Sequence, residues 1–301
     1  MAIYLGIDGG GTKTTCVVAD KHSVLGSATS GGSNLTRWGE ARVREALQTG
    51  VKEACAKAGV DPQKIDRTCV GLSGAGRPEV REAVARMMSE IVGGQVQVVS
   101  DLETTLEAAF GLGPGVITIS GTGSIAYGRD TQGHTARSGG WGLAISDEGS
   151  GQWIGRAAVS AVLGAKDAGD EPALLASILQ GWKLSTLDEL VRHANASPAP
   201  DFSSLFPLVL EAGGHGDALA GTVLDRAGVE LAALARNVIH RLFGGVGSVP
   251  VAMSGGVFRQ SERVRQVFYN SVVGELPQAR VQGRVVEAVD GALALARKAR
   301  V

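Results

Sequence analysis

Two glycine-rich turns carry the residue types that bind phosphate groups. The first occupies residues 9–14, Gly-Gly-Gly-Thr-Lys-Thr, directly after a β-rich run that ends in Asp8. The second occupies residues 121–124, Gly-Thr-Gly-Ser, after another β-branched run. Such turns expose several backbone N–H groups at one point, and these groups attract phosphate oxygens. Hydroxyl and ammonium groups at 12–14 add donors, and the Asp8 carboxylate could hold Mg²⁺ directly or through water.

Neither turn matches the common nucleotide motifs. A dinucleotide fingerprint needs a helix after its glycines, whereas a run of strand character follows here, and no GxxxxGK[ST] string occurs. Each turn alone could be an ordinary tight hairpin. Two similar turns about 110 residues apart, with a third Gly-Gly pair at 255–256, favour a shared role instead.

Asp101 follows a predicted strand directly. The apolar run 95–100 predicts that strand, so that the Asp101 side chain stands at its carboxyl end. One interpretation is that Asp101 only caps the helix predicted after it.

Asn34, Trp141 and Asp147 each have a structural interpretation. Asn34 could shape a Gly-Gly-Ser-Asn turn, and Asp147 could only start the next helix. Trp141 could be an aromatic that packs at a hinge. The five histidines lack ligand spacing, which favours surface or structural roles over metal binding.

The elements that must position these residues repeat along the chain. Strand, turn and returning strand are predicted at 3–20 and again at 116–127, with a shorter echo at 249–256. Further strands are predicted at 66–71 and 95–100, and helices at 40–58, 77–92, within 151–240 and at 291–300. Gly-Leu-Gly-Pro-Gly at 111–115 interrupts the apolar periodicity. We therefore expect domains at 1–113 and 114–301, with the last helix able to pack back on the first domain.

Composition excludes several classes of protein. The chain has 29 Lys and Arg against 30 Asp and Glu, so it lacks the basic footprint of a nucleic-acid binder. No apolar stretch approaches the roughly 20 residues that span a bilayer, and no leader precedes the first strand, which predicts a cytoplasmic protein. Cys16, Cys55 and Cys69 form no CxxC pair, so reduced thiols are expected rather than a zinc site or disulfides.

Five strings appear in order along the chain: GIDGGGTKT at 6–14, ISGTGS at 119–124, GGWG at 139–142, DEGSG at 147–151 and MSGGV at 253–257. Together they resemble the N-acetylglucosamine kinase and BadF/BadG/BcrA/BcrD ATPase group of the actin, Hsp70 and hexokinase superfamily. The resemblance implies an α/β fold of two actin-like (ribonuclease H-like) domains. Each would be a mixed sheet flanked by helices, with a nucleotide and sugar cleft between them.

The resemblance also implies a role for each matched residue. Asp101 would be catalytic and would contact the sugar, and Asp8 would hold the metal. The nucleotide and its phosphates would be bound by Gly10, Gly11, Thr12, Lys13, Thr14, Gly121, Thr122, Gly213, Gly255 and Gly256. The sugar pocket would comprise Asn34, Asp101, Gly140, Trp141, Gly142 and Asp147.

The implied activity is ATP- and Mg²⁺-dependent phosphorylation of a hexosamine, either N-acetylglucosamine or glucosamine, at the C6 hydroxyl. A homodimer that engages neither nucleic acid nor membrane is expected. The alternative is a BadF/BadG-type ATPase that activates a partner enzyme. Such activators bridge a dimer with an iron–sulfur cluster, which needs clustered thiolates, whereas the three cysteines here are scattered. A non-catalytic regulator is a third possibility, and the intact set of Asp8, Asn34, Asp101 and Asp147 argues against it.

Overall fold

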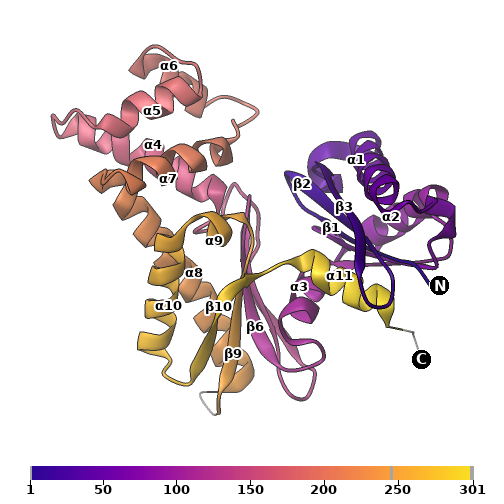
Figure 1. The fold of residues 1–301 in the computed structure, drawn as a ribbon. Helices are drawn as coiled ribbons and strands as arrows, with labels where there is room; N and C mark the ends of the chain where they lie inside the picture. The colour runs from indigo at the N-terminus through magenta and orange to yellow at the C-terminus, as the bar shows by residue number, and fades with distance from the viewer. Residues whose placement is uncertain (1, 245–246, 299–301) are drawn as a thin grey trace. The chain divides into compact units, whose positions relative to one another are not determined.

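The computed structural model describes residues 2–244 and 247–298. The chain divides into two compact units: one holds the chain up to Gly113 together with the segment from Val286, and the other holds Pro114–Val285. Each unit contains a five-stranded sheet (Figure 1). The functional domains 1–113 and 114–301 stay a prediction, and the C-terminal segment is grouped with the first unit.

The first sheet has the strand order β3-β2-β1-β4-β5. Its antiparallel part consists of β1 (Tyr4–Gly9), β2 (Lys13–Ala19) and β3 (Val24–Gly31). β4 (Arg67–Leu72) pairs parallel with β1, and β5 (Gln95–Ser100) pairs parallel with β4. Parallel neighbours need crossover connections, which here contain α1 (Leu35–Ala58), the short η1 (Pro62–Lys64) and α2 (Pro78–Ile91). The carboxyl ends of β1, β4 and β5 therefore share one edge of the sheet.

The two faces of this sheet are covered by helices from opposite ends of the chain. Leu5 and Ile7 belong to a core shared with α1 and α2, whereas Tyr4 packs with Leu293 of α11 (Ala288–Arg297). This alternation follows from the two-residue period of a strand. α11 also packs against α3 (Asp101–Phe110), and a Cβ atom on Gly291 would lie only 1.8 Å from the Thr104 carbonyl oxygen.

The second sheet repeats this topology, with the strand order β10-β9-β6-β7-β8. β6 (Gly115–Ser120), β7 (Ser124–Arg129) and β8 (Thr135–Gly139) form an antiparallel meander. β9 (Val249–Ser254) pairs parallel with β6, and β10 (Ala279–Val286) occupies the edge. β6 is thus the counterpart of β1, which agrees with the duplicated pattern in the sequence.

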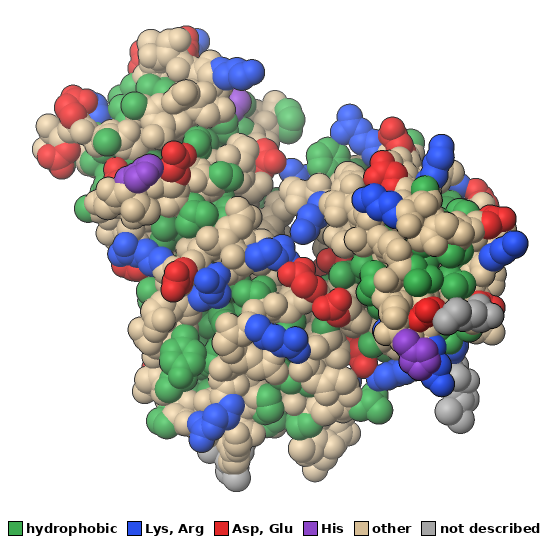
Figure 2. All heavy atoms as spheres, in the orientation of Figure 1, with side chains coloured by type: hydrophobic (Ala, Val, Ile, Leu, Met, Phe, Trp, Pro, Cys, Tyr) green, Lys and Arg blue, Asp and Glu red, His purple; other side chains and the backbone are tan. Residues whose placement is uncertain are grey.

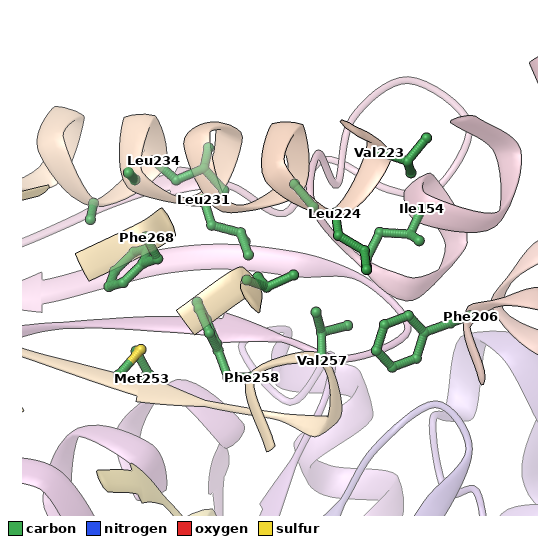
Figure 3. Packing of buried hydrophobic residues seen from close by; sticks show 14 of the residues in the cluster. Ile154, Phe206, Val223, Leu224, Leu231, Leu234, Met253, Val257, Phe258 and Phe268 are labelled. Carbon is green, nitrogen blue, oxygen red and sulfur yellow. The ribbon is translucent and has the colours of Figure 1, made fainter. Parts of the chain in front are cut away.

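Helices supply most of the second unit's core. They are α4 (Gly151–Asp167), α5 (Ala173–Gly181), α6 (Leu187–Ala194), η2 (Phe202–Leu205), α7 (Phe206–Gly214), α8 (Ala218–Phe243), α9 (Gly256–Gln260) and α10 (Glu262–Glu275). Leu231 and Leu234 of α8 point into the cluster that contains Phe258 and Phe268 (Figure 3). The two phenyl rings pack edge to face with centroids 5.1 Å apart, an arrangement that aromatic quadrupoles favour.

The surface shows the mixed charge that the composition predicts. On the face drawn in Figure 2, basic and acidic side chains are interspersed rather than gathered into one large field. In the described part of the chain, no helix combines the length and apolar character needed to cross a membrane.

Candidate active site

In the first unit, the glycine turn between β1 and β2 is held by bonds to its own carbonyl groups. The N–H of Gly10 donates to the Lys13 oxygen over 2.9 Å, and the Ser33 N–H donates to the Gly10 oxygen over 3.0 Å. The indole Nε1 of Trp38 donates to the Gly11 oxygen over 2.7 Å. Within residues 2–244 and 247–298, the N–H groups of Gly11 and Thr12 have no partner. The turn therefore offers donors and hides acceptors, as an anion site requires.

Side chains in this turn differ in what they can reach. Thr12 and Lys13 are exposed, whereas Thr14 is fully buried. The Thr14 hydroxyl donates to the Gly31 oxygen over 2.7 Å and lies 2.8 Å from the Ser33 hydroxyl. Thr14 thus holds β2 to the end of β3, and its hydroxyl is already used within the fold.

Asp8 occupies the end of β1, where it pairs in register with Thr15 of β2 and Gly71 of β4. Its side chain is partly buried beside the glycine turn. In the described part of the chain, no group of three or more His, Cys, Asp or Glu side chains could hold a metal ion. One carboxylate beside a phosphate site fits Mg²⁺, which keeps several waters and takes its other ligands from substrate phosphates.

Asp101 is the first residue of α3 but does not cap it. Ser100 is the N-cap: its hydroxyl accepts from the Glu103 N–H over 3.3 Å, and the Glu103 carboxylate reaches back to the Ser100 hydroxyl. Ser100, and not Asp101, is therefore the N-cap. The Asp101 carboxylate accepts hydrogen bonds from the N–H groups of Leu102 and Asp101, in the first turn of α3, and from the Ser73 hydroxyl. Burial raises the pKa of Asp101 to about 6, and these bonds only partly oppose the rise.

Asn34 and Ser73 join the Asp101 carboxylate in a chain of hydrogen bonds. The Asn34 side-chain oxygen accepts from the Arg37 N–H over 3.0 Å and caps α1, while its Nδ2 donates to the Ser73 hydroxyl over 3.3 Å. Asn34 thus has the structural role of a cap and also binds the loop that follows β4. The three side chains follow β3, β4 and β5, so each comes from the end of a different strand of the first unit.

Ser73 is the residue that sequence reasoning missed. It lies in Leu72-Ser73-Gly74, directly after β4. Asp8 of β1 pairs in register with Gly71, two residues before Ser73, so Asp8 and Ser73 lie at the same edge of the sheet. The signal in the sequence was a hydroxyl residue at the start of a glycine-containing loop that follows a parallel strand. The carboxyl ends of such strands gather the polar side chains of ligand sites.

In the second unit, the turn between β6 and β7 is bonded to the segment 147–151. The Gly151 N–H donates to the Gly121 oxygen over 2.8 Å, and the Ser120 and Ser124 hydroxyls donate to the oxygens of Gly149 and Glu148. Thr122, at the tip, is partly exposed. The turn therefore has a fixed shape that leaves its tip accessible.

Gly255 lies beside this turn, at the end of β9. Its φ is +100°, and a Cβ atom there would lie 2.2 Å from the Ser120 oxygen, so only glycine fits. Gly256 then begins α9. Gly213 lies elsewhere in the unit, in the last turn of α7, where a Cβ atom would lie 3.0 Å from a Leu224 methyl carbon of α8.

Asp147 binds the loop 140–142 to the second turn. Its carboxylate accepts from the N–H groups of Ser124 and Gly142, and it is 5% exposed. Burial raises the pKa of Asp147, these two bonds oppose the rise, and the Glu148 charge adds to it. Its φ of +68° is unusual outside glycine and marks a constrained site. The N-cap of α4 is Ser150, so Asp147 does not start that helix.

Trp141 is exposed to solvent rather than packed in the core of the second unit. Its side chain is 65% exposed, and the Arg137 guanidinium lies 4.0 Å from the ring centroid. Gly140 and Gly142 flank it with φ of +69° and +109°. A loop of this geometry presents one indole face to solvent, which suits stacking on a sugar ring.

Two sheets with the same strand order, each opening on a glycine-turn hairpin, define the actin-like ATPase class of α/β proteins. The model of the BadF/BadG/BcrA/BcrD ATPase family matches residues 5–295. The chain belongs to this family, and its expected α/β fold is confirmed.

Named relatives are similar over nearly their whole length. The chain is 32% identical to the N-acetylmuramic acid/N-acetylglucosamine kinase of Clostridium acetobutylicum, with 99% of both chains covered. It is 29% identical to the N-acetyl-D-glucosamine kinase of Dictyostelium discoideum, with 98% of this chain and 97% of that one covered. A solved structure assigned as an N-acetylglucosamine kinase from Chromobacterium violaceum has a TM-score of 0.76 at 28% identity, covering 98% of this chain and 99% of that one.

Proposed function

We propose that the chain is an ATP-dependent kinase that phosphorylates a hexosamine, N-acetylglucosamine or glucosamine, at its C6 hydroxyl. The observation that carries the proposal is Asp101, a partly buried carboxylate at the end of β5 whose pKa is raised to about 6 and which is bonded to Ser73. A carboxylate in this state is ionised at neutral pH yet basic enough to accept a hydroxyl proton. The names of the similar kinases support the choice of an amino sugar.

In the proposed reaction, the Asp101 carboxylate accepts the proton of the C6 hydroxyl. The hydroxyl oxygen forms a bond to the γ-phosphorus of ATP, and the bond between that phosphorus and the β–γ bridging oxygen breaks, releasing ADP. Within the turn 10–14, the backbone N–H groups of Gly11 and Thr12 would bind the phosphates from the first unit. Asn34 would bond to a sugar hydroxyl and hold α1 in place.

Mg²⁺, held through Asp8, would neutralise charge on the β- and γ-phosphates. From the second unit, Gly121, Thr122, Gly255 and Gly256 would face the nucleotide, with Gly213 a further contact. Trp141 and Asp147, with the glycines beside Trp141, would complete the sugar pocket. The domains 1–113 and 114–301, a homodimer and a cytoplasmic location belong to the same proposal.

The cysteines argue against the partner-activating alternative. An activator's cluster needs thiolates at an accessible interface, whereas Cys16, Cys55 and Cys69 are all buried in the first unit. Burial, with smaller contributions from neighbouring groups, raises the pKa of Cys16 to about 12 and that of Cys55 to about 11. These thiols are structural.

The test is ATP consumption across a panel of hexoses and hexosamines, with wild type beside Asp101→Asn. We expect turnover that depends on an amino sugar and falls by about 10²- to 10⁴-fold in the variant, with ATP binding retained. ATP hydrolysis that is slow and indifferent to every sugar would refute the kinase and favour the partner-activating ATPase.

A further inference from the structure

Two carbonyl groups of the first glycine turn accept hydrogen bonds from outside the turn. The Gly10 oxygen accepts from the Ser33 N–H over 3.0 Å, and the Gly11 oxygen accepts from the Trp38 indole over 2.7 Å. Both peptide groups are trans, so that each C=O and the N–H that follows it point in opposite directions. A bond that fixes one of these carbonyls therefore also fixes the N–H of the next residue.

Each unbonded donor of the turn thus has its own anchor. The bond from Ser33 sets the direction of the Gly11 N–H, and the bond from Trp38 sets the direction of the Thr12 N–H. Peptides beside a glycine rotate easily, because no Cβ atom restricts them. If the peptide between Gly11 and Thr12 rotated, its carbonyl oxygen would replace its N–H at the anion site and repel a phosphate.

Gly32 leaves the space through which the indole reaches the turn. A Cβ atom on Gly32 would lie 2.6 Å from both the Gly11 oxygen and the Trp38 Nε1, so a side chain there would displace the two atoms of this bond. The guanidinium groups of Arg37 and Arg42 lie 4.9 and 5.4 Å from the centroid of the indole. Such contacts are attractive and favour one orientation of the ring.

Trp38 is carried by a single helical turn that begins at Asn34. Its backbone N–H donates to the Asn34 oxygen over 3.0 Å, and Gly39 then departs from helical geometry with φ +73° and ψ 167°. The bonds that hold this turn come from the backbone and from the Asn34 side chain. Removing only the indole N–H should therefore leave the turn and its cap in place.

We propose that Trp38 is a positioning residue, whose indole N–H holds the Gly11 carbonyl away from the anion site and so aims the Thr12 N–H at a phosphate of ATP. The inference rests on the proposed kinase function. Trp38 acts through Gly11 rather than by touching the nucleotide. The donor is then in place before ATP arrives, and pre-oriented donors bind charge more strongly than donors that must reorganise.

The test removes the indole donor in two ways that keep an aromatic ring. One variant is Trp38→Phe, and the other replaces Trp38 by benzothienylalanine, which has the shape of tryptophan with sulfur in place of the N–H. We would measure the Kd for Mg·AMP-PNP by calorimetry and the KM for ATP and for the amino sugar. We expect both nucleotide constants to rise about 2- to 10-fold, as suits the loss of one hydrogen bond. The KM for the amino sugar should stay within about twofold.

Trp182→Phe is the matched control. The Trp182 indole also donates a hydrogen bond, to the Ser204 hydroxyl over 3.0 Å, but it lies in the second unit among the helices that follow α4. This variant loses the same chemical group at a place without a glycine turn. Its constants for nucleotide and amino sugar should equal those of wild type within about twofold.

Amide resonances of the turn report on the peptide directly. The Gly10 N–H is bonded to the Lys13 oxygen over 2.9 Å, so its ¹⁵N–¹H resonance in the nucleotide-free protein reports whether the turn is intact. In Trp38→Phe that resonance should keep its wild-type position. Addition of Mg·AMP-PNP should shift the Thr12 amide proton downfield in wild type and by less in the variant. A Trp38 that only stabilises the fold would change the Gly10 resonance as well.

The outcomes distinguish this inference from the kinase function. Nucleotide affinity and a Thr12 shift that neither Trp38 variant changes would overturn the inference and leave the kinase intact, and so would equal losses for nucleotide and amino sugar. If wild type phosphorylates no sugar, binding of Mg·AMP-PNP still decides: weaker binding in the Trp38 variants supports the positioning role and refutes only the kinase. A wild type that binds no nucleotide refutes both.

Discussion

Replacing Asp101 with asparagine should stabilise the first unit while removing activity. The rise of the Asp101 pKa from 3.8 to about 6 means that the folded protein disfavours the ionised carboxylate. At pH 8 this corresponds to ~3 kcal/mol of lost stability, since one pKa unit is about 1.4 kcal/mol. Because the side chain is partly exposed, solvent screening lowers the expected gain to about 1–3 kcal/mol.

The difference in stability between Asp101→Asn and wild type should depend on pH. Between pH 3.8 and about 6 the folded protein binds more protons at Asp101 than the unfolded chain does, so wild-type stability falls as pH rises through this window. Below the window the carboxyl is neutral in both states and no penalty exists. Asparagine never ionises, so the stability gap between variant and wild type should open across the window. It should be about half as large at pH 5 as at pH 8.

The assay is urea unfolding at pH 5, 6.5 and 8, followed by ¹⁹F resonances of 5-fluorotryptophan. Trp38 is the tryptophan of the first unit, and Trp141, Trp153 and Trp182 belong to the second, so each unit has its own reporter. Glu53→Gln, which removes an exposed charge from α1, is the control and should stay within about 0.5 kcal/mol of wild type. A gap that is constant with pH, or a variant less stable than wild type at pH 8, would refute the reasoning.

Three other perturbations test separate parts of the structure. Ser73→Ala should move the acid limb of the kcat/KM profile to higher pH, because the Ser73 hydroxyl holds the pKa of Asp101 down; an unmoved limb would contradict that bond. Gly291→Ala should destabilise the first unit by about 1–3 kcal/mol in urea unfolding, since its Cβ would clash with the Thr104 oxygen, whereas Gly274→Ala meets open space and should not. The three thiols should resist Ellman's reagent at pH 8 until urea is added, because all are buried; rapid native labelling would contradict this.

The sequence predicted the hairpins because their pattern is local. β-branched runs on either side of a glycine turn specify β1 with β2 and β6 with β7 without reference to distant residues, and both pairs are confirmed. β3 was not predicted. Its sequence, Val-Leu-Gly-Ser-Ala-Thr-Ser-Gly, has little strand propensity, and its place in the sheet comes from pairing with β2. The edge strand β10, similarly polar, was missed for the same reason.

The types of the candidate site residues could be predicted from the sequence, but the contacts that these residues make could not. The role proposed for Asp101 came from the family resemblance, and its bond to Ser73 joins two segments that are far apart in the sequence. Thr14 was expected to offer a hydroxyl, but the register between β2 and β3 turns that hydroxyl toward Gly31. Strand register is fixed by packing of the whole sheet, so no short window of sequence contains this information.

Different side chains hold the glycine turn in each of the two units. In the first, Trp38 and Ser33 donate to the carbonyls of the glycine turn, so helix α1 holds the turn's shape. In the second, Ser120 and Ser124 donate outward from the turn to the segment that begins with Asp147. The first turn is thereby coupled to the Asn34 cap, and the second to the Trp141 loop through the Asp147 carboxylate. Each glycine turn is therefore bonded to a segment carrying a proposed sugar-binding residue, so a sugar bound at that residue would act on the shape of the turn through these bonds.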